Sequence, residues 1–428
     1  MIVGHKIRLD PDDVQEMYFR KACGVARFAY NGALDEWTRQ YQAHKADPSL
    51  PKPSETALRR QLNAIKREKF PWMLEVTKNA PQMAIIQLGT AFRNFFEGRS
   101  QFPQFHTKGV HDRFFLTNDQ FEVRDRKIRI PLLGWVRMNE SLRFSGKIQS
   151  ATVSRVADRW FVSIAVETGD RPERSAENQG AVGVDLGITA LATLSTGEKV
   201  TGPEPHKALL KRQRRLSRSL SRKHKTAKVN MGLAPDAPLP KGVRLPVSEN
   251  AKKSRAKLSR LHARIANIRQ DALHQLTSEL TRRFHTIAIE SLNVRGMMKN
   301  HSRARSMADM SFFEFRRQLE YKSERRGGRV VVADRWFPSS KTCSGCGTVQ
   351  DKMPLSVRQW ICPDCGTTHD RDVNAARNLL ALGMAAPSRP TASSAGSDAC
   401  GESAQQGTRK LRTSRPERKQ DPDSRLGE

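Results

Sequence analysis

The spacing of hydrophobic residues divides the chain into segments of different kinds. Residues 2–9 read as one short strand, and Asp10-Pro11 supplies an N-cap and a first-turn proline for a following helix. From there to about Phe96, apolar side chains recur at three- and four-residue spacing, which predicts helices with breaks near residues 47–53 and 70–71. The first helix is expected to bury a stripe formed by Val14, Met17, Tyr18, Ala22, Val25, Phe28 and Ala29.

The spacing of hydrophobic residues is different between about Phe114 and Glu167. Short runs rich in Val, Ile, Phe and Trp, such as residues 127–130 and 159–166, alternate with turn residues, which is typical of a small β-rich unit. Residues 169–180 are polar and rich in turn formers, and the apolar run AVGVDLGITALATL follows them directly. A domain boundary is therefore expected there.

Two later segments combine a helical period with charge of a single sign. Residues 207–225 contain nine Lys or Arg and no acid, and residues 252–269 contain seven more with no acid. A linker with Pro and Gly joins them at about 231–246. Charge runs are usually solvated helix faces, but such faces mix signs, so we interpret these helices as nucleic-acid contacts. The candidate residues are Lys211, Arg212, Arg214, Arg215, Arg218, Arg222, Arg260, Arg264 and Arg269.

Other segments predict neither a membrane anchor nor a secretory signal. No uninterrupted apolar run approaches the roughly 20 residues that span a bilayer, and the first residues lack the apolar core of a signal peptide. An intracellular protein without a membrane partner is expected. Residues 384–428 are rich in small and polar side chains without periodicity, so a disordered tail is expected.

The overall charge narrows the class of partner. The chain of 428 residues has 75 Lys and Arg against 44 Asp and Glu, a formal net charge of +31. An excess of this size favours a polyanionic partner, whereas a small acidic metabolite would not require it.

Four of the six cysteines form two matched pairs. Cys343-x2-Cys346 and Cys362-x2-Cys365 are separated by 15 residues, the spacing of a four-cysteine zinc ribbon. A redox CxxC pair or two disulfides would not need a second pair with glycines in equivalent places. Four thiolates leave no open coordination position, so one structural Zn²⁺ without a role in the chemistry is predicted. The other two cysteines are expected to be unpaired.

Three acidic residues stand where strands end or a helix begins. Asp185 lies in the apolar run 181–188, where a carboxylate is costly unless it is paired, hydrogen-bonded or bound to metal. Glu290 ends a similar short strand, and the two strands could lie side by side. Asp372 lies at or near the N-terminus of a helix that runs through Leu380. Three such acids can hold two divalent cations about 4 Å apart, which together activate water and stabilise the leaving oxygen of a phosphodiester.

Spacing alone leaves simpler explanations open for each acid. Asp185 could cap a turn, Glu290 could pair with a nearby arginine, and Asp372 could be an ordinary N-cap. The pattern by itself therefore gives a hypothesis rather than an assignment.

Six motifs in a fixed order resemble the TnpB family, the transposon-encoded OrfB group related to type V CRISPR effectors. They are RFAYN, GVDLGI, KLSRLHARIANIRQDALHQLT, IAIESLNV, RWFPSSKTCSGCG and WICPDCGTTHDRDVNAARN. The resemblance extends to about residue 383. One departure is the long, Pro-rich connection at 231–246, which touches no acidic motif.

The resemblance implies a multidomain α/β fold. It predicts a RuvC-like, RNase H-type nuclease domain with an inserted four-cysteine zinc ribbon, and an N-terminal β-rich wedge domain interrupted by a helical recognition insert. The wedge domain would comprise residues 1–10 and 111–180, the insert 11–110, the nuclease domain 181–336 and 369–383 with basic helices within 207–280, and the zinc ribbon 337–368.

The resemblance also implies roles for individual residues. The catalytic acids of the family match Asp185, Glu290 and Asp372, with Asp370 as the runner-up for the third position, and they would bind Mg²⁺, two ions in all. Lys78, Gln82 and Thr117 look similar to family positions that read the DNA motif flanking the target. For these three, an ordinary polar helix face is the alternative.

The function implied is an RNA-guided, metal-dependent endonuclease that cleaves double-stranded DNA beside a short flanking motif. Its guide RNA would come from the transposon end, and one protein with one RNA would act on nucleoid DNA in the cytoplasm of a prokaryote. A guide-dependent regulator that binds DNA without cutting is the alternative. A self-sufficient single-strand transposase would need a nucleophilic tyrosine beside a His pair, and the chain has four Tyr and no HxH.

Overall fold

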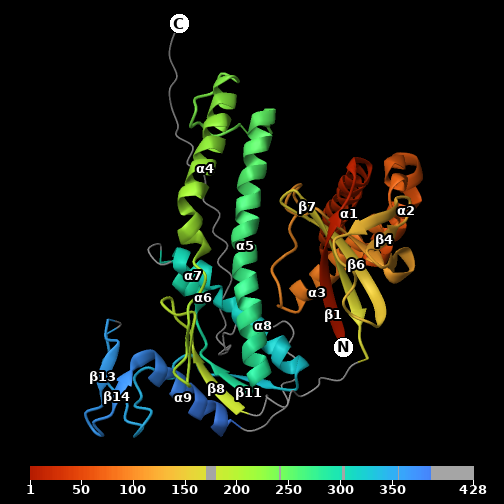
Figure 1. Ribbon diagram of the computed structural model, residues 1–428. Coiled ribbons are helices and arrows are strands. Elements are labelled where there is room, and N and C mark those ends of the chain that lie inside the picture. The colour runs from red at the N-terminus through yellow and green to blue at the C-terminus, as the bar shows by residue number, and fades with distance from the viewer. Residues whose placement is uncertain (170–179, 241, 301–303, 355, 387–428) are drawn as a thin grey trace, which may run out of the picture.

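The computed structural model describes residues 1–169, 180–240, 242–300, 304–354 and 356–386. These residues form an N-terminal part around one sheet, a second part around another sheet, and a small unit with the four paired cysteines, of which Cys362 and Cys365 lie in a two-stranded hairpin (Figure 1). Within them, no helix is both long enough and apolar enough to cross a membrane.

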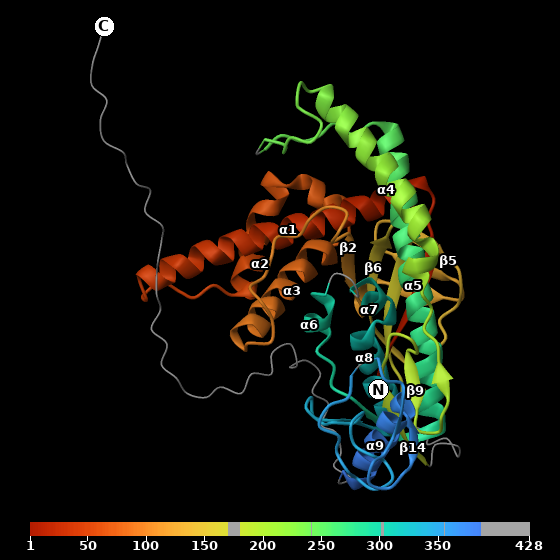
Figure 2. The ribbon, with the colours of Figure 1, turned by 90° about the vertical axis from the view of Figure 1, so that its left-hand side faces the viewer.

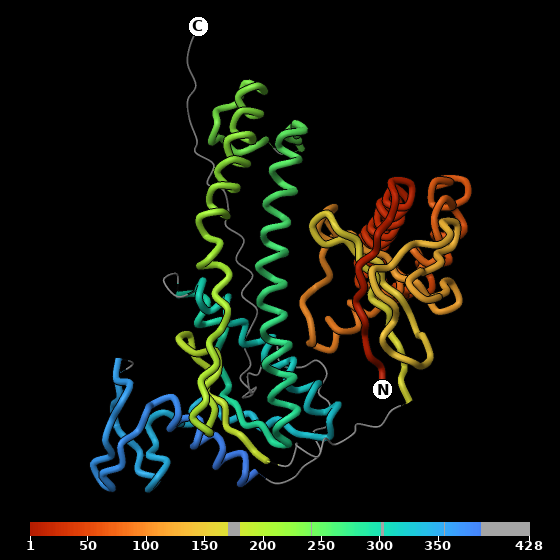
Figure 3. The backbone as a smooth tube through the Cα atoms, in the orientation of Figure 1, coloured from red at the N-terminus to blue at the C-terminus, as the bar shows by residue number. Residues whose placement is uncertain are grey.

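The N-terminal sheet has seven strands, and its neighbouring strands all pair antiparallel. The first strand of the sequence lies inside it, between the fifth and seventh, so residues far apart in sequence share one sheet (Figure 3). Side chains of this strand alternate between exposed and buried, as expected for a sheet with one covered face. The strands in spatial order are β2 (Arg113–Thr117), β6 (Lys147–Val156), β7 (Arg159–Glu167), β1 (Ile2–Asp10), β5 (Gly134–Met138), β4 (Lys127–Ile130) and β3 (Glu122–Arg124).

Helices between β1 and β2 cover this sheet, and the expected breaks are confirmed. They are α1 (Asp13–Ala46), α2 (Glu55–Lys69), the 3₁₀ turn η1 (Pro71–Glu75) and α3 (Asn79–Phe96). The 3₁₀ turn η2 (Asn118–Gln120) follows β2. The N-cap of α1 is Asp12 rather than Asp10, because Asp10 still belongs to β1 and the Asp12 carboxylate accepts the Gln15 amide.

The apolar stripe expected on α1 is only partly buried. Tyr18, Ala22, Val25 and Ala29 lie in the core, but Val14, Met17 and Phe28 are 69%, 54% and 41% exposed. The stripe is thus wider than the face that α1 presents to the sheet and to α3. Phe28 packs instead at the edge of the core, with its ring 5.0 Å from that of Phe70 and 5.2 Å from that of Trp72.

The second sheet has five strands with a parallel centre. In spatial order they are β10 (Lys199–Val200), β9 (Ala192–Leu194), β8 (Gly180–Asp185), β11 (Phe284–Ile289) and β12 (Arg329–Val332). The pairs β8–β11 and β11–β12 are parallel, and the pairs β8–β9 and β9–β10 are antiparallel.

The two faces of this sheet carry side chains of different size. Val182, Val184, Ile287 and Ile289 form a core with residues of α5 (Glu249–Arg283) and α8 (Phe312–Arg325). On the other face, Ala288 packs with Leu379 of α9 (Arg371–Ala385). Small residues on that face allow α9 to lie close to the strands, which sets the position of its first turn.

The basic segments form two long helices, as expected from their periodicity. Helix α4 (Pro205–Val229) packs along α5, and the pair rises from the second sheet beside the N-terminal part (Figures 1 and 2). The short helices α6 (Val294–Met298) and α7 (Ala304–Met310) lie between β11 and α8 in sequence. The cysteine-bearing hairpin of β13 (Gln359–Ile361) and β14 (Thr368–Asp370) leads directly into α9.

Two expectations fall largely outside the described residues. The expected boundary at 169–180 includes residues 170–179, and the expected tail includes residues 387–428. Helix α9 continues to Ala385, so it extends two residues into the range expected as tail.

Candidate active site and metal centre

Asp185 and Glu290 lie at the carboxyl ends of two neighbouring parallel strands. Asp185 is the last residue of β8, and Glu290 directly follows β11. Because Val184 pairs with Ile289, the two acids follow at the same edge of the sheet. The Leu186 amide donates a hydrogen bond of 3.3 Å to Glu290 Oε1. The expectation that the two strands lie side by side is therefore confirmed.

Helix α9 brings Asp372 to the same edge because Gly183 lets it approach β8. A Cβ atom at Gly183 would lie 1.8 Å from the Ala376 carbonyl oxygen and 2.5 Å from the Leu380 nitrogen. Ala376 is one turn after Asp372, so the first turn of α9 lies over the end of β8. Asp372 is close enough to Asp185 for their charges to interact.

Burial and mutual repulsion make two of these acids hold protons tightly. Burial raises the pKa of Asp185 well above its ordinary value, and the charges of Glu290 and Asp372 raise it further. Burial raises the pKa of Glu290 to about 7, although the Leu186 amide acts against this. Such clustered, desolvated carboxylates are stabilised when a divalent cation replaces the protons.

Asp370, the other candidate for the third acid, is occupied by structural contacts. Its Oδ1 accepts the amides of Asp372 and Val373 at 3.1 and 3.0 Å, so it is the N-cap of α9. Its Oδ2 lies 2.8 Å from Lys199 Nζ. Burial raises its pKa, but the Lys199 and amide hydrogen bonds outweigh burial, and the pKa lies below its ordinary value.

An arginine that the sequence did not single out also reaches this cluster. Arg358, the residue before β13, places a guanidinium nitrogen 3.5 Å from Asp372 Oδ1. Its carbonyl accepts the Arg371 amide at 2.8 Å, which fixes the hairpin against the start of α9. Among 75 basic residues, nothing in the local pattern distinguishes Arg358, because the contact depends on how the hairpin packs.

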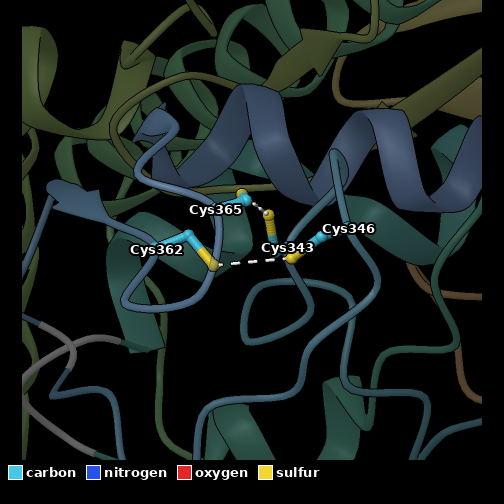
Figure 4. A group of neighbouring side chains, drawn as sticks. All are labelled: Cys343, Cys346, Cys362 and Cys365. Atoms are coloured by element: carbon cyan, nitrogen blue, oxygen red, sulfur yellow. Dashed lines mark hydrogen bonds between the residues drawn. The ribbon is translucent and has the colours of Figure 1, made fainter.

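The four paired cysteines converge, as their spacing predicts (Figure 4). Their sulfur atoms lie within 4.8 Å of one another, with 3.6 Å between Cys343 and Cys365 and between Cys346 and Cys362. Within the described ranges this is the one group of at least three His, Cys, Asp or Glu whose ligand atoms all lie so close. The three carboxylates do not form a group this tight.

The two cysteine pairs adopt the same tight turn. Gly347 and Gly366 have φ of +85° and +70°, a left-handed conformation that favours glycine, and each donates its amide to the first cysteine of its pair at 2.9 Å. Hydrogen bonds with the hydroxyl and the amide of Thr348 lower the pKa of Cys346 to about 6. A set of four converging thiols of this kind fits Zn²⁺, which four thiolates bind in tetrahedral geometry.

The cysteine cluster is joined to the helix that carries Asp372. His369 Nε2 lies 3.0 Å from Cys343 Sγ. Asn374 of α9 accepts the Ser344 amide at 2.9 Å and donates to the Thr342 carbonyl at 2.7 Å. Order in the cysteine turns therefore supports the start of α9. Of the remaining cysteines, Cys23 is buried and free, and Cys400 lies outside the described residues.

The three candidate DNA-reading residues lie near one another. Lys78 is the N-cap of α3, and Gln82 is exposed in the first turn of that helix. Asn79 donates a hydrogen bond of 2.6 Å to the Thr117 hydroxyl, which holds this turn against the end of β2. Thr117 in turn donates to Asp119.

The basic residues of α4 and α5 differ in their contacts. Lys211, Arg214, Arg215, Arg218 and Arg222 line an open groove of about 640 Å³ along α4. By contrast, Arg260 of α5 pairs with Asp158 at 2.6 Å, and Arg269 donates to the Ala308 carbonyl. Two of the three α5 candidates thus have protein partners. In the part of the chain that the structure describes, no carboxylate lies within 4 Å of the five candidate basic side chains that line the α4 groove.

Comparisons with known proteins agree with this architecture. A family model described as "Probable transposase" matches residues 163–301, one described as "Cas12f1-like, TNB domain" matches 312–379, and one described as "Helix-turn-helix domain" matches 1–46. Over 1–46 the structure has a strand and one long helix rather than two helices.

Relatives match nearly the whole chain. A Streptomyces pristinaespiralis protein named "Putative RNA-guided DNA endonuclease" is 37% identical, over 97% of this chain and 95% of its own length. An Escherichia coli (strain K12) protein named "Putative RNA-guided DNA endonuclease InsQ" is 32% identical, over 94% of each. The solved Cas12f1–sgRNA–target DNA complex is similar in fold, with a TM-score of 0.52 and 16% identity over 85% of this chain and 82% of that one.

The fold and the site define a Cas12f-like multidomain α/β protein with a TNB domain and a four-cysteine cluster. The identity to full-length relatives and the transposase model go further. The chain belongs to the TnpB (OrfB) family, as the order of its motifs indicated.

Proposed function

We propose that this protein is an RNA-guided endonuclease that cleaves double-stranded DNA beside a short flanking motif. The observation that carries the proposal is the meeting of Asp185, Glu290 and Asp372 at one edge of the second sheet. The names of its full-length relatives support the same activity. A regulator that only binds DNA would have no use for three acids whose proximity costs stability.

The three carboxylates would hold divalent cations, and their oxygen ligands suit Mg²⁺. When bound, a pair of such ions would supply activation of water and stabilisation of the leaving oxygen of the phosphodiester. Asp185 and Glu290 would give up their protons on binding metal, because burial has raised their pKa values. Gly183 sets the distance from Asp372 to Asp185, and Asp370 caps the helix without joining the metal set.

The four cysteines would hold one structural Zn²⁺. Their sulfurs are close enough for a single ion, and all four positions are taken by protein ligands. The hydrogen bonds of Asn374 to the cysteine turns then make zinc a support for α9.

The domain assignment follows the two sheets. The seven-stranded sheet would be the wedge domain, at residues 1–10 and 111–180, and α1 to α3 the recognition insert, at 11–110. The five-stranded sheet with its helices would be the RuvC-like domain, at 181–336 and 369–383. Residues 337–368 would be the zinc ribbon.

The nucleic acids would be a guide RNA from the transposon end and the target duplex. The groove along α4 offers phosphate contacts, with Arg212 and Arg264 as additional ones. Lys78, Gln82 and Thr117 would read the flanking motif, and the hydrogen bond of Asn79 to Thr117, which joins the start of α3 to the end of β2, supports this proposal. One protein with one RNA would act on nucleoid DNA in a prokaryotic cytoplasm.

A cleavage assay on a plasmid library with randomised flanking sequence tests the proposal. The protein is co-expressed with the RNA from the 3′ end of its own gene and assayed in Mg²⁺ and in EDTA, beside Asp185→Ala. Cutting that needs the guide, the metal and Asp185 is expected. Guide-dependent binding with intact plasmid in both Mg²⁺ and Mn²⁺ would contradict it.

A further inference from the structure

The segment that joins β12 to the cysteine cluster passes directly beside the acid site. The Ala333 amide donates to the Ile289 carbonyl at 2.8 Å, and Glu290 is the next residue after Ile289. On its other side, Asn378 of α9 donates to the Ser339 carbonyl at 2.7 Å. The segment is therefore fixed to two of the three elements that bring acids to the site, β11 and α9.

Trp336 stands out from this segment. Its side chain is 81% exposed, the largest value among the large hydrophobic residues that the structure describes. Its backbone is nevertheless held in place, since its amide donates to Asp334 Oδ1 at 2.8 Å. The next residue, Phe337, packs against Ala288 and Leu379 beneath the sheet. A held turn thus presents a largely exposed indole ring to solvent.

Arg335 completes a surface suited to one kind of partner. Its guanidinium lies over the Trp336 ring, 5.2 Å from the ring centroid. In the described part of the chain, no carboxylate lies within 4 Å of this guanidinium. An aromatic face beside a free arginine binds nucleic acid by stacking on a base and contacting its phosphate. In a duplex both faces of a base are covered, so the partner of such a surface is an unpaired strand.

We propose that Trp336 and Arg335 form a stacking platform that holds an unpaired DNA strand beside Glu290. The proposal rests on the proposed nuclease function for the identity of the strand. The platform would bind bases without sequence preference, since every base has an aromatic face. By fixing a nucleotide near the scissile bond, it would hold the phosphodiester against the acids.

Crosslinking tests contact without requiring cleavage. The protein–guide RNA complex is mixed in EDTA with single-stranded DNA carrying 5-iodouracil and irradiated, and the adducts are mapped by mass spectrometry. An adduct on Trp336 that Trp336→Ala abolishes is expected. Trp72, which is 41% exposed in the N-terminal part, serves as the matched control, and Trp72→Ala should leave the adduct unchanged.

Cleavage kinetics test the role in positioning. Trp336→Ala is expected to lower single-turnover cleavage of subsaturating guide-matched DNA by about 5- to 100-fold, whereas Trp336→Phe retains most activity because its ring still stacks. An abasic nucleotide at the stacked position should slow the wild type but slow Trp336→Ala no further. Zinc content and melting temperature of each variant report whether the fold is intact.

The outcomes separate the two proposals. If the wild-type complex fails to cut but the Trp336 adduct forms, the platform stands and the nuclease proposal fails. If the wild type cuts, Trp336→Ala cuts equally fast, and no adduct forms at Trp336, the platform is disproved. An adduct confined to Arg-rich α4 would also overturn it.

Discussion

The cysteine cluster and the acid cluster are assembled in opposite ways. All four cysteines lie within residues 343–365, in two copies of one tight turn. Of the three acids, Asp185 ends a strand, Glu290 directly follows another strand, and Asp372 lies in the first turn of a helix. Spacing alone determines the first site, whereas strand pairing and helix packing create the second. The two sites should therefore respond differently to mutation.

The largest expected effect is the loss of cleavage on removing one acid. Asp185→Asn should lower guide-dependent cleavage by at least about 1,000-fold, because the proposed metal site would lose a ligand. It should also raise the melting temperature of the metal-free protein at neutral pH, since asparagine removes a buried carboxyl group whose ionised form is destabilised by burial and by the neighbouring acids. Zinc content by elemental analysis should not change, and a loss of zinc in this variant would show that the two sites are not separate.

The reverse experiment removes a zinc ligand. Cys343→Ser should abolish zinc binding and lower cleavage by about 100-fold, because the turns that hold α9 lose their order and Asp372 moves. Excess Mg²⁺ should not restore activity. Cys400→Ser is the control, and it should keep both zinc and activity. Normal cleavage by zinc-free Cys343→Ser would contradict a supporting role for the cluster.

Gly183 tests whether helix packing positions the acids. Gly183→Ala should lower cleavage by about 10- to 100-fold and destabilise the fold by about 1–3 kcal/mol, because the new methyl group forces α9 away from β8. Gly4→Ala is the matched control, since Gly4 is also in a strand but has no atom within 4 Å of its added Cβ. Equal activity of the two variants in the cleavage assay would refute this role.

The pKa of Glu290 predicts how stability depends on pH. Its folded value of about 7 exceeds the ordinary 4.5, so the metal-free folded state binds the proton more tightly than the unfolded state. The contribution of Glu290 to the free energy of unfolding is therefore greatest below about pH 4.5. It falls as the pH rises through 7, by up to about 3 kcal/mol in total. Chemical denaturation in EDTA should show this loss, and Glu290→Gln should reduce it. If the free energy of unfolding of Glu290→Gln depends on pH as steeply as that of the wild type, the raised pKa does not belong to Glu290.

The smallest effects are expected on the basic helices. Arg218→Ala on α4 should weaken RNA binding a few-fold and lower the salt dependence by about 0.7 to 0.9 per lost phosphate contact. Arg260→Ala on α5 should leave the salt dependence unchanged, because Arg260 is engaged by Asp158. Filter binding of guide RNA from 50 to 300 mM salt measures both. If the RNA affinity of the two variants depends equally on salt concentration, the expected difference between α4 and α5 in phosphate contacts does not exist.

The same contrast explains what the sequence could predict. The cysteine site and the strand–helix alternation follow from local spacing, and the structure agrees with both. The choice between Asp370 and Asp372 does not follow from local spacing. The two residues lie two positions apart at the start of one helix, and only the structure shows that Asp370 is the N-cap while the charge of Asp372 acts on Asp185. Arg358 and the protein contacts of Arg260 depend on packing between distant segments. Local sequence patterns therefore do not predict these contacts.

The most direct test compares two neighbouring aspartates. Asp372→Asn and Asp370→Asn are assayed as guide RNA complexes on matched DNA in Mg²⁺, with melting temperature as the measure of folding. Asp372→Asn should fold and fail to cut, whereas Asp370→Asn should keep nearly all of its stability, because asparagine caps a helix about as well as aspartate, and should still cut. Cleavage by Asp372→Asn at the wild-type rate would show that the acids gathered by the fold are not the active site.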